Sequence, residues 1–319
     1  MKKTILYGNG LNYHPNTKDK SITWGELLAD IMNGQVFITD FLPNTLAYER
    51  IRLNWNRNSH KLPHLKNRIK ELLKNQPANS YYEEILKIDC DNYITTNYDY
   101  AINKTFLNSN KQNSETNNSS EELYSIRRNT SLIANQEKVK TIWNIHGELS
   151  NPKSIMLGLN HYSGSIGKIA DYLKGTYDFR YKGQKNEVKK IEEKLKGNLY
   201  DEYSWIELFF NSNLHIIGFG LDFSEIDLWW LLTKRARLIE DGLINNSVSF
   251  YVKPLSELEE KIDKEKDDNK KRNQIVKLET ESRKYETLLE LNVDVKEISS
   301  RNGYSNYWNE IFETIKTSS

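Results

Sequence analysis

Cysteine is almost absent from this chain, with Cys90 the single example among 319 residues. One cysteine excludes an internal disulfide and a zinc module built from four cysteines. Cys90 also lies between Asp89 and Asp91, whose negative charges do not favour a reactive thiolate. The six histidines show no spacing typical of metal ligands, so the sequence predicts no metal site.

Long apolar runs are absent as well. No stretch of 18 or more apolar residues occurs, which excludes a typical membrane-spanning helix. The apolar run at the N-terminus covers only residues 4–7 and is too short for the apolar region of a signal peptide. We therefore expect a soluble protein located in the cytoplasm.

An excess of charge of either sign is also missing. The 45 Lys and Arg residues nearly balance the 44 Asp and Glu residues, which gives a formal net charge of +1. Without a strong overall electrostatic field, neither nucleic acid nor an anionic membrane is an expected partner.

The most informative feature of the sequence is a set of four short apolar runs, each of which ends in polar or glycine residues. The runs cover residues 3–7, 92–96, 140–145 and 214–217. Helical patterns separate them, and further strands are expected at residues 248–252 and 293–298. Strands that alternate with helices and are apolar on both faces predict an α/β fold, with a mostly parallel sheet and helices on both of its faces. The carboxyl ends of such strands line a ligand-binding crevice.

Two segments depart from this alternation. Residues 108–122 are almost wholly polar and predict a mobile surface insertion, which we place at about residues 105–135. Residues 160–200 are rich in glycine and charge but contain one narrow apolar stripe, which predicts an inserted helical subdomain. We expect residues 1–319 to form a single domain that carries both insertions.

Two smaller features complete the predicted secondary structure. Residues 154–157 have the apolar character of a short additional strand. Residues 255–291 have a helical pattern, but their middle is almost wholly charged or polar. This charged middle predicts two helices with a break rather than one continuous coiled coil.

The polar residues at the ends of the four runs are the candidate functional residues. Gly8 and Gly10 suit a phosphate-binding turn, although a tight strand-to-helix turn explains them equally well. A buried carboxamide such as Asn97 can orient a water or hydroxyl, or it can hold a turn. The imidazole of His146 can accept a proton near neutral pH, whereas many buried histidines serve only structure.

The fourth run has similar alternatives. Gly218 and Gly220 suit either a ligand-binding turn or a tight strand-to-helix turn. Asp222 and Ser224 follow them at the start of a predicted helix with an acidic first turn. Helix capping is the simplest interpretation of these two side chains.

In order along the chain, the motifs GNGLN at residues 8–12, TNYD at 96–99, HG at 146–147 and GFGL at 218–221 resemble those of the sirtuin superfamily. The segment GLDFSEIDLWW at residues 220–230 is similar in particular to the bacterial sirtuin-like domains of anti-phage defence systems. The likeness extends over nearly the whole chain, and the order and strand-end placement of the motifs give it its specificity. It implies a Rossmann-like fold that binds NAD.

This resemblance implies a role for each motif. His146 would be the catalytic base, and Asn97 and Asp99 would be the other catalytic residues, at the nicotinamide end. The remaining positions would bind NAD. Gly8, Asn9, Gly10 and Asn12 would contact the phosphates and the nicotinamide-side ribose, and Gly218, Gly220 and Leu221 would lie on the adenosine side. Thr96 would also bind NAD.

Deacylating sirtuins also carry a zinc module with four cysteines, which a chain with one cysteine cannot form. The expected activity is therefore hydrolysis of NAD, with NAD as substrate and neither zinc nor another cofactor. His146 would accept a proton from water or a ribose hydroxyl, Asn97 would position that oxygen, and Asp99 would polarise or orient the leaving group. Two alternatives stay open: ADP-ribosyl transfer to a macromolecule, and a catalytically silent nucleotide-binding sensor or scaffold.

A cell cannot tolerate an unregulated enzyme that depletes NAD. The resemblance therefore implies an anti-phage defence effector that is restrained until infection. The expected partners, besides NAD, are further copies of the chain in a homo-oligomer and a partner protein of a defence system.

Overall fold

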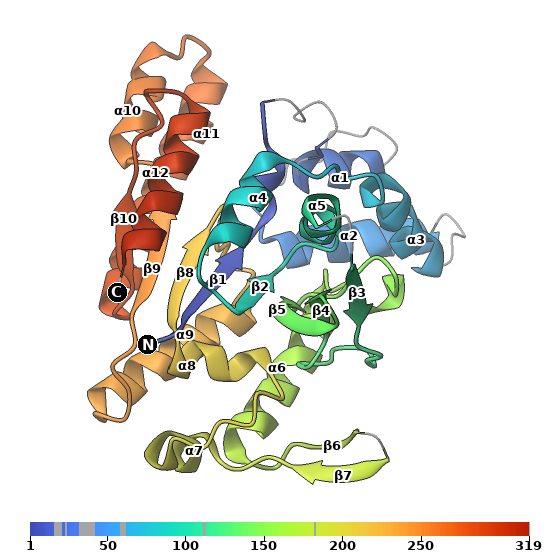
Figure 1. The fold of residues 1–319 in the computed structure, drawn as a ribbon. Helices are drawn as coiled ribbons and strands as arrows, with labels where there is room; N and C mark the ends of the chain where they lie inside the picture. The colour runs from blue at the N-terminus through green and yellow to red at the C-terminus, as the bar shows by residue number, and fades with distance from the viewer. Residues whose placement is uncertain are drawn as a thin grey trace.

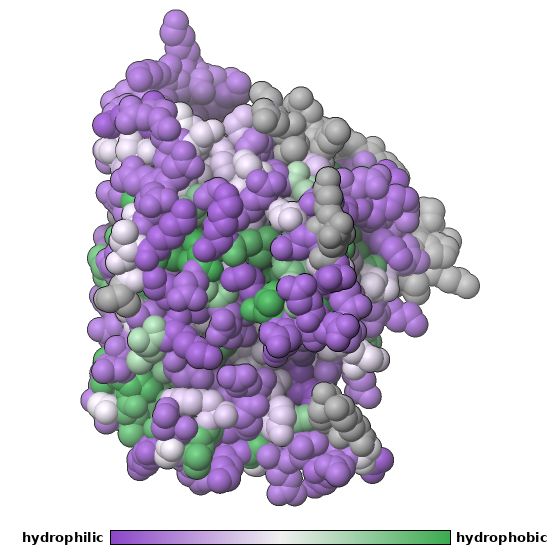
Figure 2. Space-filling view, viewed as in Figure 1, coloured by the Kyte–Doolittle hydropathy of each residue, from purple (hydrophilic) through white to green (hydrophobic). Residues whose placement is uncertain are grey.

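The structure is a computed structural model that describes residues 1–15, 21–22, 24–31, 42–57, 62–110, 113–181 and 183–318. Residues 111, 112 and 182, which belong to the two predicted insertions, lie outside this range. Helices surround a central sheet, and a helical hairpin stands at one side of it (Figure 1). Hydrophilic residues cover most of the face seen in Figure 2. No described helix has the length and apolar character needed to cross a membrane.

The central sheet has the strand order β10-β9-β8-β1-β2-β5-β4-β3. From β10 to β5 all neighbouring strands run parallel, and β4 and β3 add an antiparallel edge. The predicted α/β fold with a mostly parallel sheet is therefore confirmed. The strands are β1 (Lys3–Tyr7), β2 (Asn92–Thr95), β3 (Ser114–Asn118), β4 (Asn129–Ala134), β5 (Glu137–Asn144), β8 (Asn213–Ile217), β9 (Val248–Val252) and β10 (Asp294–Glu297).

The chain order changes direction at β1. Strands β2 and β5 follow on one side of it, and β8, β9 and β10 return on the other. Open α/β sheets bind their ligands at this kind of switch point, outside the carboxyl ends of the strands. The helices are α1 (Trp24–Ile31), α2 (Asn44–Arg57), α3 (Leu62–Leu73), α4 (Ser80–Lys87), α5 (Ala101–Ser109), α6 (Leu159–Lys174), α7 (Ile191–Gly197), α8 (Leu208–Asn211), α9 (Ile226–Glu240), α10 (Leu255–Lys264), α11 (Asp268–Glu290) and α12 (Tyr304–Thr317).

Helices cover both faces of the sheet, as the apolar strands predict. Along β1, Ile5 and Tyr7 belong to an apolar cluster with α4, α5 and α12. Leu6, between them, belongs to a second cluster with α6, α8 and α9. This alternation is the period-two pattern of a strand buried on both sides.

A third apolar cluster covers the carboxyl ends of β2 and β5. It joins Leu27 of α1, Tyr48 of α2 and Leu65 of α3 to Tyr98 and Leu157 in the loops that follow the two strands. These helices therefore hold the loops that carry the predicted site residues.

Residues 108–122, predicted as a mobile surface insertion that is too polar to pack, contain regular structure. Strand β3 lies within it and pairs antiparallel with β4, and Ser119 N continues the pairing by donating to Asn129 O at 2.8 Å. The sequence is polar because β3 is an edge strand with largely exposed side chains, and its backbone pairing needs no apolar residue.

The predicted helical insertion at residues 160–200 contains more than helices. Helices α6 and α7 flank an antiparallel hairpin, β6 (Asp178–Tyr181) and β7 (Gln184–Glu187), which the sequence analysis missed. Its strands are short, polar and solvent-exposed on most described side chains, so they carry little periodic signal. That residues 1–319 form one domain stays a prediction.

Residues 154–157 do not form the short strand that was expected. A 3-10 turn, η3 (Pro152–Ser154), is followed by an extended segment in which Met156 N donates to His146 O at 2.8 Å. Ile155 and Leu157 are apolar because they pack in the third cluster. By contrast, the predicted break between two C-terminal helices is confirmed: α10 ends at Lys264, and the Asp267 carboxylate caps α11.

Candidate active site

A cavity opens at the carboxyl ends of β1, β2, β5 and β8. Its volume is about 330 Å³, at the lower end of the range of small-molecule and cofactor sites. All four strand-end segments contribute to its lining: Asn9 and Gly10, Thr96 to Asp99, His146, and Gly218 to Asp222. Positions far apart in sequence therefore meet in one place, as expected from parallel strands.

The loop after β1 is packed directly against the loop after β8. Gly10 N donates to Gly218 O at 2.8 Å, and Gly8 N donates to Ile217 O at 3.2 Å. A Cβ atom on Gly10 would lie 2.7 Å from the Gly218 Cα. Close backbone approach therefore requires glycine at this position, in agreement with the tight-turn interpretation, while Gly10 also lines the cavity.

Replacing Gly10 by alanine is expected to lower the free energy of unfolding by about 1–3 kcal/mol, because the added methyl group collides with backbone atoms that cannot rotate away. Urea denaturation of the variant measures this change. Gly167→Ala is the matched control: a Cβ there meets nothing within 4 Å, in the interior of α6, and alanine favours the helix. Equal stability of the two variants would contradict the packing seen between the loops.

Asn12 and Gly8 lie behind the cavity and do not line it. The Asn12 side chain is buried, and its Nδ2 donates to Asn9 Oδ1 at 2.8 Å and to Asp99 Oδ2 at 3.0 Å. Its Oδ1 accepts the hydroxyl of Tyr82 at 2.7 Å. Asn12 therefore connects the loops after β1 and β2 through a buried hydrogen-bond network.

Asn97 presents an amide group that no described residue satisfies. Its side chain is buried and lines the cavity, yet Nδ2 makes no hydrogen bond. The hydroxyl of Tyr82 lies near this carboxamide but donates to Asn12 Oδ1. Because a buried amide donor without a partner is costly, its position at the cavity wall favours binding of a ligand oxygen.

Asp99 makes hydrogen bonds that support the fold and also lines the cavity. Its Oδ1 accepts Ala101 N at 2.9 Å at the start of α5, and its Oδ2 accepts the Asn12 amide. Burial raises the pKa of Asp99 above its usual value, although these hydrogen bonds oppose the shift. The Asp99 side chain thus holds the start of α5 and also lines the cavity.

His146 lies between two carboxylates of the segment that begins α9. Its Nε2 is 3.0 Å from Asp227 Oδ2, and its Nδ1 is 3.4 Å from Glu225 Oε2. The hydroxyl of Tyr162 donates to the same Glu225 oxygen at 2.7 Å, and the Tyr162 ring meets the imidazole edge-on. His146 is 2% exposed and Asp227 is fully buried, so their pairing offsets the cost of burying these polar groups.

The carboxylates change the proton affinity of the imidazole. Burial alone would lower the pKa of His146, but the negative charges of Asp227 and Glu225 outweigh it and raise the pKa above 6.5. Burial also raises the pKa of Glu225 to about 7, and repulsion from Asp227 adds to this shift. The pKa values of two neighbouring groups are therefore both raised, and shifted pKa values are common in catalytic sites.

Sequence analysis missed Glu225 and Asp227 because acidic residues in the first turn of a helix usually interact with its N-terminus. Glu225 is the N-cap residue of α9, yet its side chain makes no capping hydrogen bond. The available signal was positional: two carboxylates follow a strand-end glycine motif at the same sheet edge as His146. Asp222 accepts Ser224 N at 2.8 Å in the turn before α9, and Glu225 occupies the N-cap position, so the interpretation that Asp222 or Ser224 caps this helix was wrong.

The ligand atoms of His146, Glu225 and Asp227 lie within 4.8 Å of one another, a spacing that a metal ion could bridge. Each imidazole nitrogen already faces a carboxylate oxygen directly. We therefore interpret the group as a charged hydrogen-bonded cluster. Cys90 precedes the amino end of β2, and burial raises the pKa of its thiol to about 11, which does not suit a nucleophile.

The loop after β8 completes the cavity with an unusual backbone. Gly218 and Leu221 both have positive φ angles, +56° and +44°, and a positive φ at a leucine is uncommon. The Nζ of Lys284, on α11, donates to Gly220 O at 2.8 Å and holds the loop from outside. All three predicted residues, Gly218, Gly220 and Leu221, line the cavity.

Comparison with known protein families gives one match to this chain. Residues 91–230 match the family model described as SIR2-like domain. The match runs from the start of β2 into α9 and includes Asn97, His146 and the loop after β8, while the loop after β1 lies before it. A search among curated proteins found no match.

Proposed function

We propose that this chain, whose residues 91–230 match the model of the SIR2-like domain, is an NAD hydrolase that cleaves the bond between nicotinamide and ribose. The products would be nicotinamide and ADP-ribose. The observation that carries this proposal is the meeting of His146 and Asn97, from separate strands, at one cavity bordered by the glycine loops.

The chemistry needs few groups. Nicotinamide leaves with the electron pair of the broken bond and so loses its positive charge, which removes the need for a general acid. A water oxygen forms the new bond to the ribose carbon, and His146 accepts the proton that this water gives up. The free amide of Asn97 orients the water oxygen, and Asp99 polarises or orients the departing ring.

The lining of the cavity also fits a dinucleotide. Among the described lining residues there is no lysine or arginine, so a pyrophosphate group would depend on backbone N–H groups. The loop after β1 forms a 3-10 turn over Asn9–Asn12, and glycines allow a ligand to approach its backbone closely. This supports the NAD-binding assignment of Asn9, Gly10 and Thr96.

The proposal is tested by incubating purified full-length chain with NAD and measuring free nicotinamide by chromatography. Release of nicotinamide and ADP-ribose in equal amounts is the expected result. NAD binding without product would instead favour a catalytically silent sensor. Transfer of label from adenine-labelled NAD to protein would favour ADP-ribosyl transfer, because that reaction has the same leaving group and a different acceptor.

Asn97→Ala is expected to reduce nicotinamide release by about 10²-fold or more, since the variant loses the amide donor that orients the attacking oxygen. Circular dichroism should show an unchanged fold, because the Asn97 side chain makes no hydrogen bond through Nδ2. Asn186→Ala in the hairpin β6–β7 is a matched control and should keep full activity. A variant of Asn97 with normal turnover would remove this residue from the mechanism.

We further propose that the chain acts as a regulated effector of anti-phage defence in the cytoplasm, as a homo-oligomer and with a partner protein. Support for this comes from the likeness of residues 220–230 to defence-associated sirtuin-like domains. Infection of bacteria that carry the chain, with intracellular NAD measured over time, tests the role. We expect intracellular NAD to fall only after infection. A constant NAD level throughout infection would contradict this role.

A further inference from the structure

The two carboxylates beside His146 occupy different positions in the site. Asp227 is fully buried and does not line the cavity, whereas Glu225 does line it. Asp227 therefore meets the imidazole from the protein interior and Glu225 meets it from the cavity side. A ligand can replace the contact with Glu225 but cannot reach the contact with Asp227.

We propose that Asp227 is a positioning residue, which accepts the Nε2–H of His146 and thereby directs Nδ1 toward the cavity as the proton-accepting nitrogen. Because a neutral imidazole carries one N–H, a hydrogen bond from Nε2–H leaves the lone pair on Nδ1. The proposal rests on the function proposed above, since it assigns the nitrogen that works as the base.

The position of Asp227 is fixed by its surroundings. It lies at the start of α9, where Leu228, Leu231 and Leu232 are buried in the apolar cluster beneath the sheet. Its Oδ1 accepts Leu228 N at 3.0 Å, and its Oδ2 faces His146. Both carboxylate oxygens of Asp227 are thus engaged, one by Leu228 N and one by His146. Of these two partners, His146 can become positively charged.

This pairing matches the demands of the reaction. When Nδ1 takes a proton, the imidazole becomes a cation, and the Asp227 carboxylate balances that charge at Nε2. Glu225 Oε2 stands 3.4 Å from Nδ1 and accepts the Tyr162 hydroxyl. A water or ribose hydroxyl that gives its proton to Nδ1 has to enter on this side and take over the contact with Glu225.

The groups that face His146 also set the expected pH dependence. They are Asp227 and Glu225 at the start of α9 and Tyr162 on α6, and Asp222 acts on Glu225 in turn. Since a base must be unprotonated, turnover rises as pH increases through the pKa of His146. Loss of the Asp227 charge lowers that pKa and moves the rise to lower pH.

Asp227→Asn tests the proposal, with Asp241→Asn at the other end of α9 as the matched control. The expected result is a fall in kcat of about 10²–10⁴-fold, a KM for NAD within a few-fold of wild type, and an acid limb of the rate profile moved to lower pH. The Asp241 variant should match wild type. Wild-type kcat in the Asp227 variant, or an unchanged acid limb, would overturn the proposal.

Nitrogen-15 NMR of the wild-type imidazole separates this proposal from the proposed function and needs no folded variant. The neutral form of His146 should carry its proton on Nε2, whether or not the chain cleaves NAD. A neutral form protonated on Nδ1 would overturn the role of Asp227 even in an active enzyme. Conversely, the expected tautomer together with no nicotinamide release would leave Asp227 as an orienting residue and reject the hydrolase.

Discussion

His146→Ala will reduce NAD cleavage by about 10²–10⁴-fold, the usual contribution of a positioned general base. The variant lacks the proposed proton acceptor, and Glu225 and Asp227 lose the imidazole that lies between them. Release of nicotinamide under saturating NAD measures kcat. Calorimetric titration with NAD should show that binding persists, because the glycine loops that approach the dinucleotide are unchanged.

His215→Gln is the control for this experiment. His215 is also buried, but it lies within β8 and contacts the Tyr251 hydroxyl, outside the cavity lining. Its replacement should leave kcat within a few-fold of wild type. In the wild-type chain, the rate of NAD cleavage should rise as the pH increases through the raised pKa of His146. A rate that falls over this pH range would contradict a role for His146 as base.

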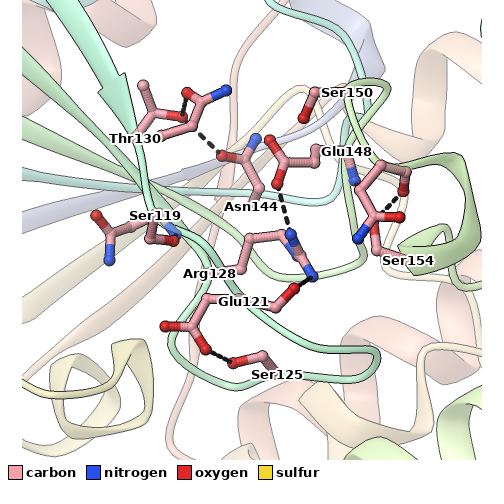
Figure 3. Close-up of polar contacts among 12 residues, drawn as sticks. Ser119, Glu121, Ser125, Arg128, Thr130, Asn144, Glu148, Ser150 and Ser154 are labelled. Carbon is pink, nitrogen blue, oxygen red and sulfur yellow. Dashed lines mark hydrogen bonds and ion pairs between the residues drawn. The ribbon is translucent and has the colours of Figure 1, made fainter. Parts of the chain in front are cut away.

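Arg128→Ala will lower the free energy of unfolding by about 3–5 kcal/mol, the usual effect of removing one partner from a buried ion pair. Arg128 precedes β4, and its Nη1 is 2.5 Å from Glu148 Oε1 (Figure 3). The side chains are 3% and 4% exposed, so the carboxylate left behind would have little access to water. The Tyr100 hydroxyl, at 2.6 Å, would still donate to it.

Urea denaturation measures this loss, and the double variant Arg128→Met, Glu148→Met separates its causes. If the cost comes from an unpaired buried charge, the double variant should be more stable than Arg128→Ala, because it contains no such charge. Arg283→Met on α11 breaks an exposed pair and should change stability little. A double variant less stable than the single one would instead assign the cost to lost side-chain packing.

This ion pair also supports the site. Arg128 Nη2 donates to the carbonyl oxygens of Glu121 and Glu122, and Glu148 N donates to the Ser154 hydroxyl at 3.1 Å. Glu148 lies two residues after His146 on the same loop. The network therefore connects the antiparallel edge of the sheet to the segment that carries the proposed base, and gives a structural role to the insertion that the sequence analysis considered mobile.

The sequence alone determined the parallel part of the sheet and indicated the edge at which the candidate site lies. Apolar runs with period-two burial are local patterns, so β1, β2, β5, β8, β9 and β10 could be predicted within a few residues. Their parallel arrangement then implied that Asn97, His146 and Gly218 would meet at one edge, and the cavity lining bears this out geometrically.

Only the tertiary structure decided which side chains complete that site. Glu225 and Asp227 are about 80 residues from His146, and no local pattern shows that a helix start brings a carboxylate to each ring nitrogen. The polar strand β3 and the hairpin β6–β7 likewise depend on partners rather than on their own composition. Periodicity records which face of an element is buried, whereas hydrogen bonds between distant elements depend on how the packed chain places them.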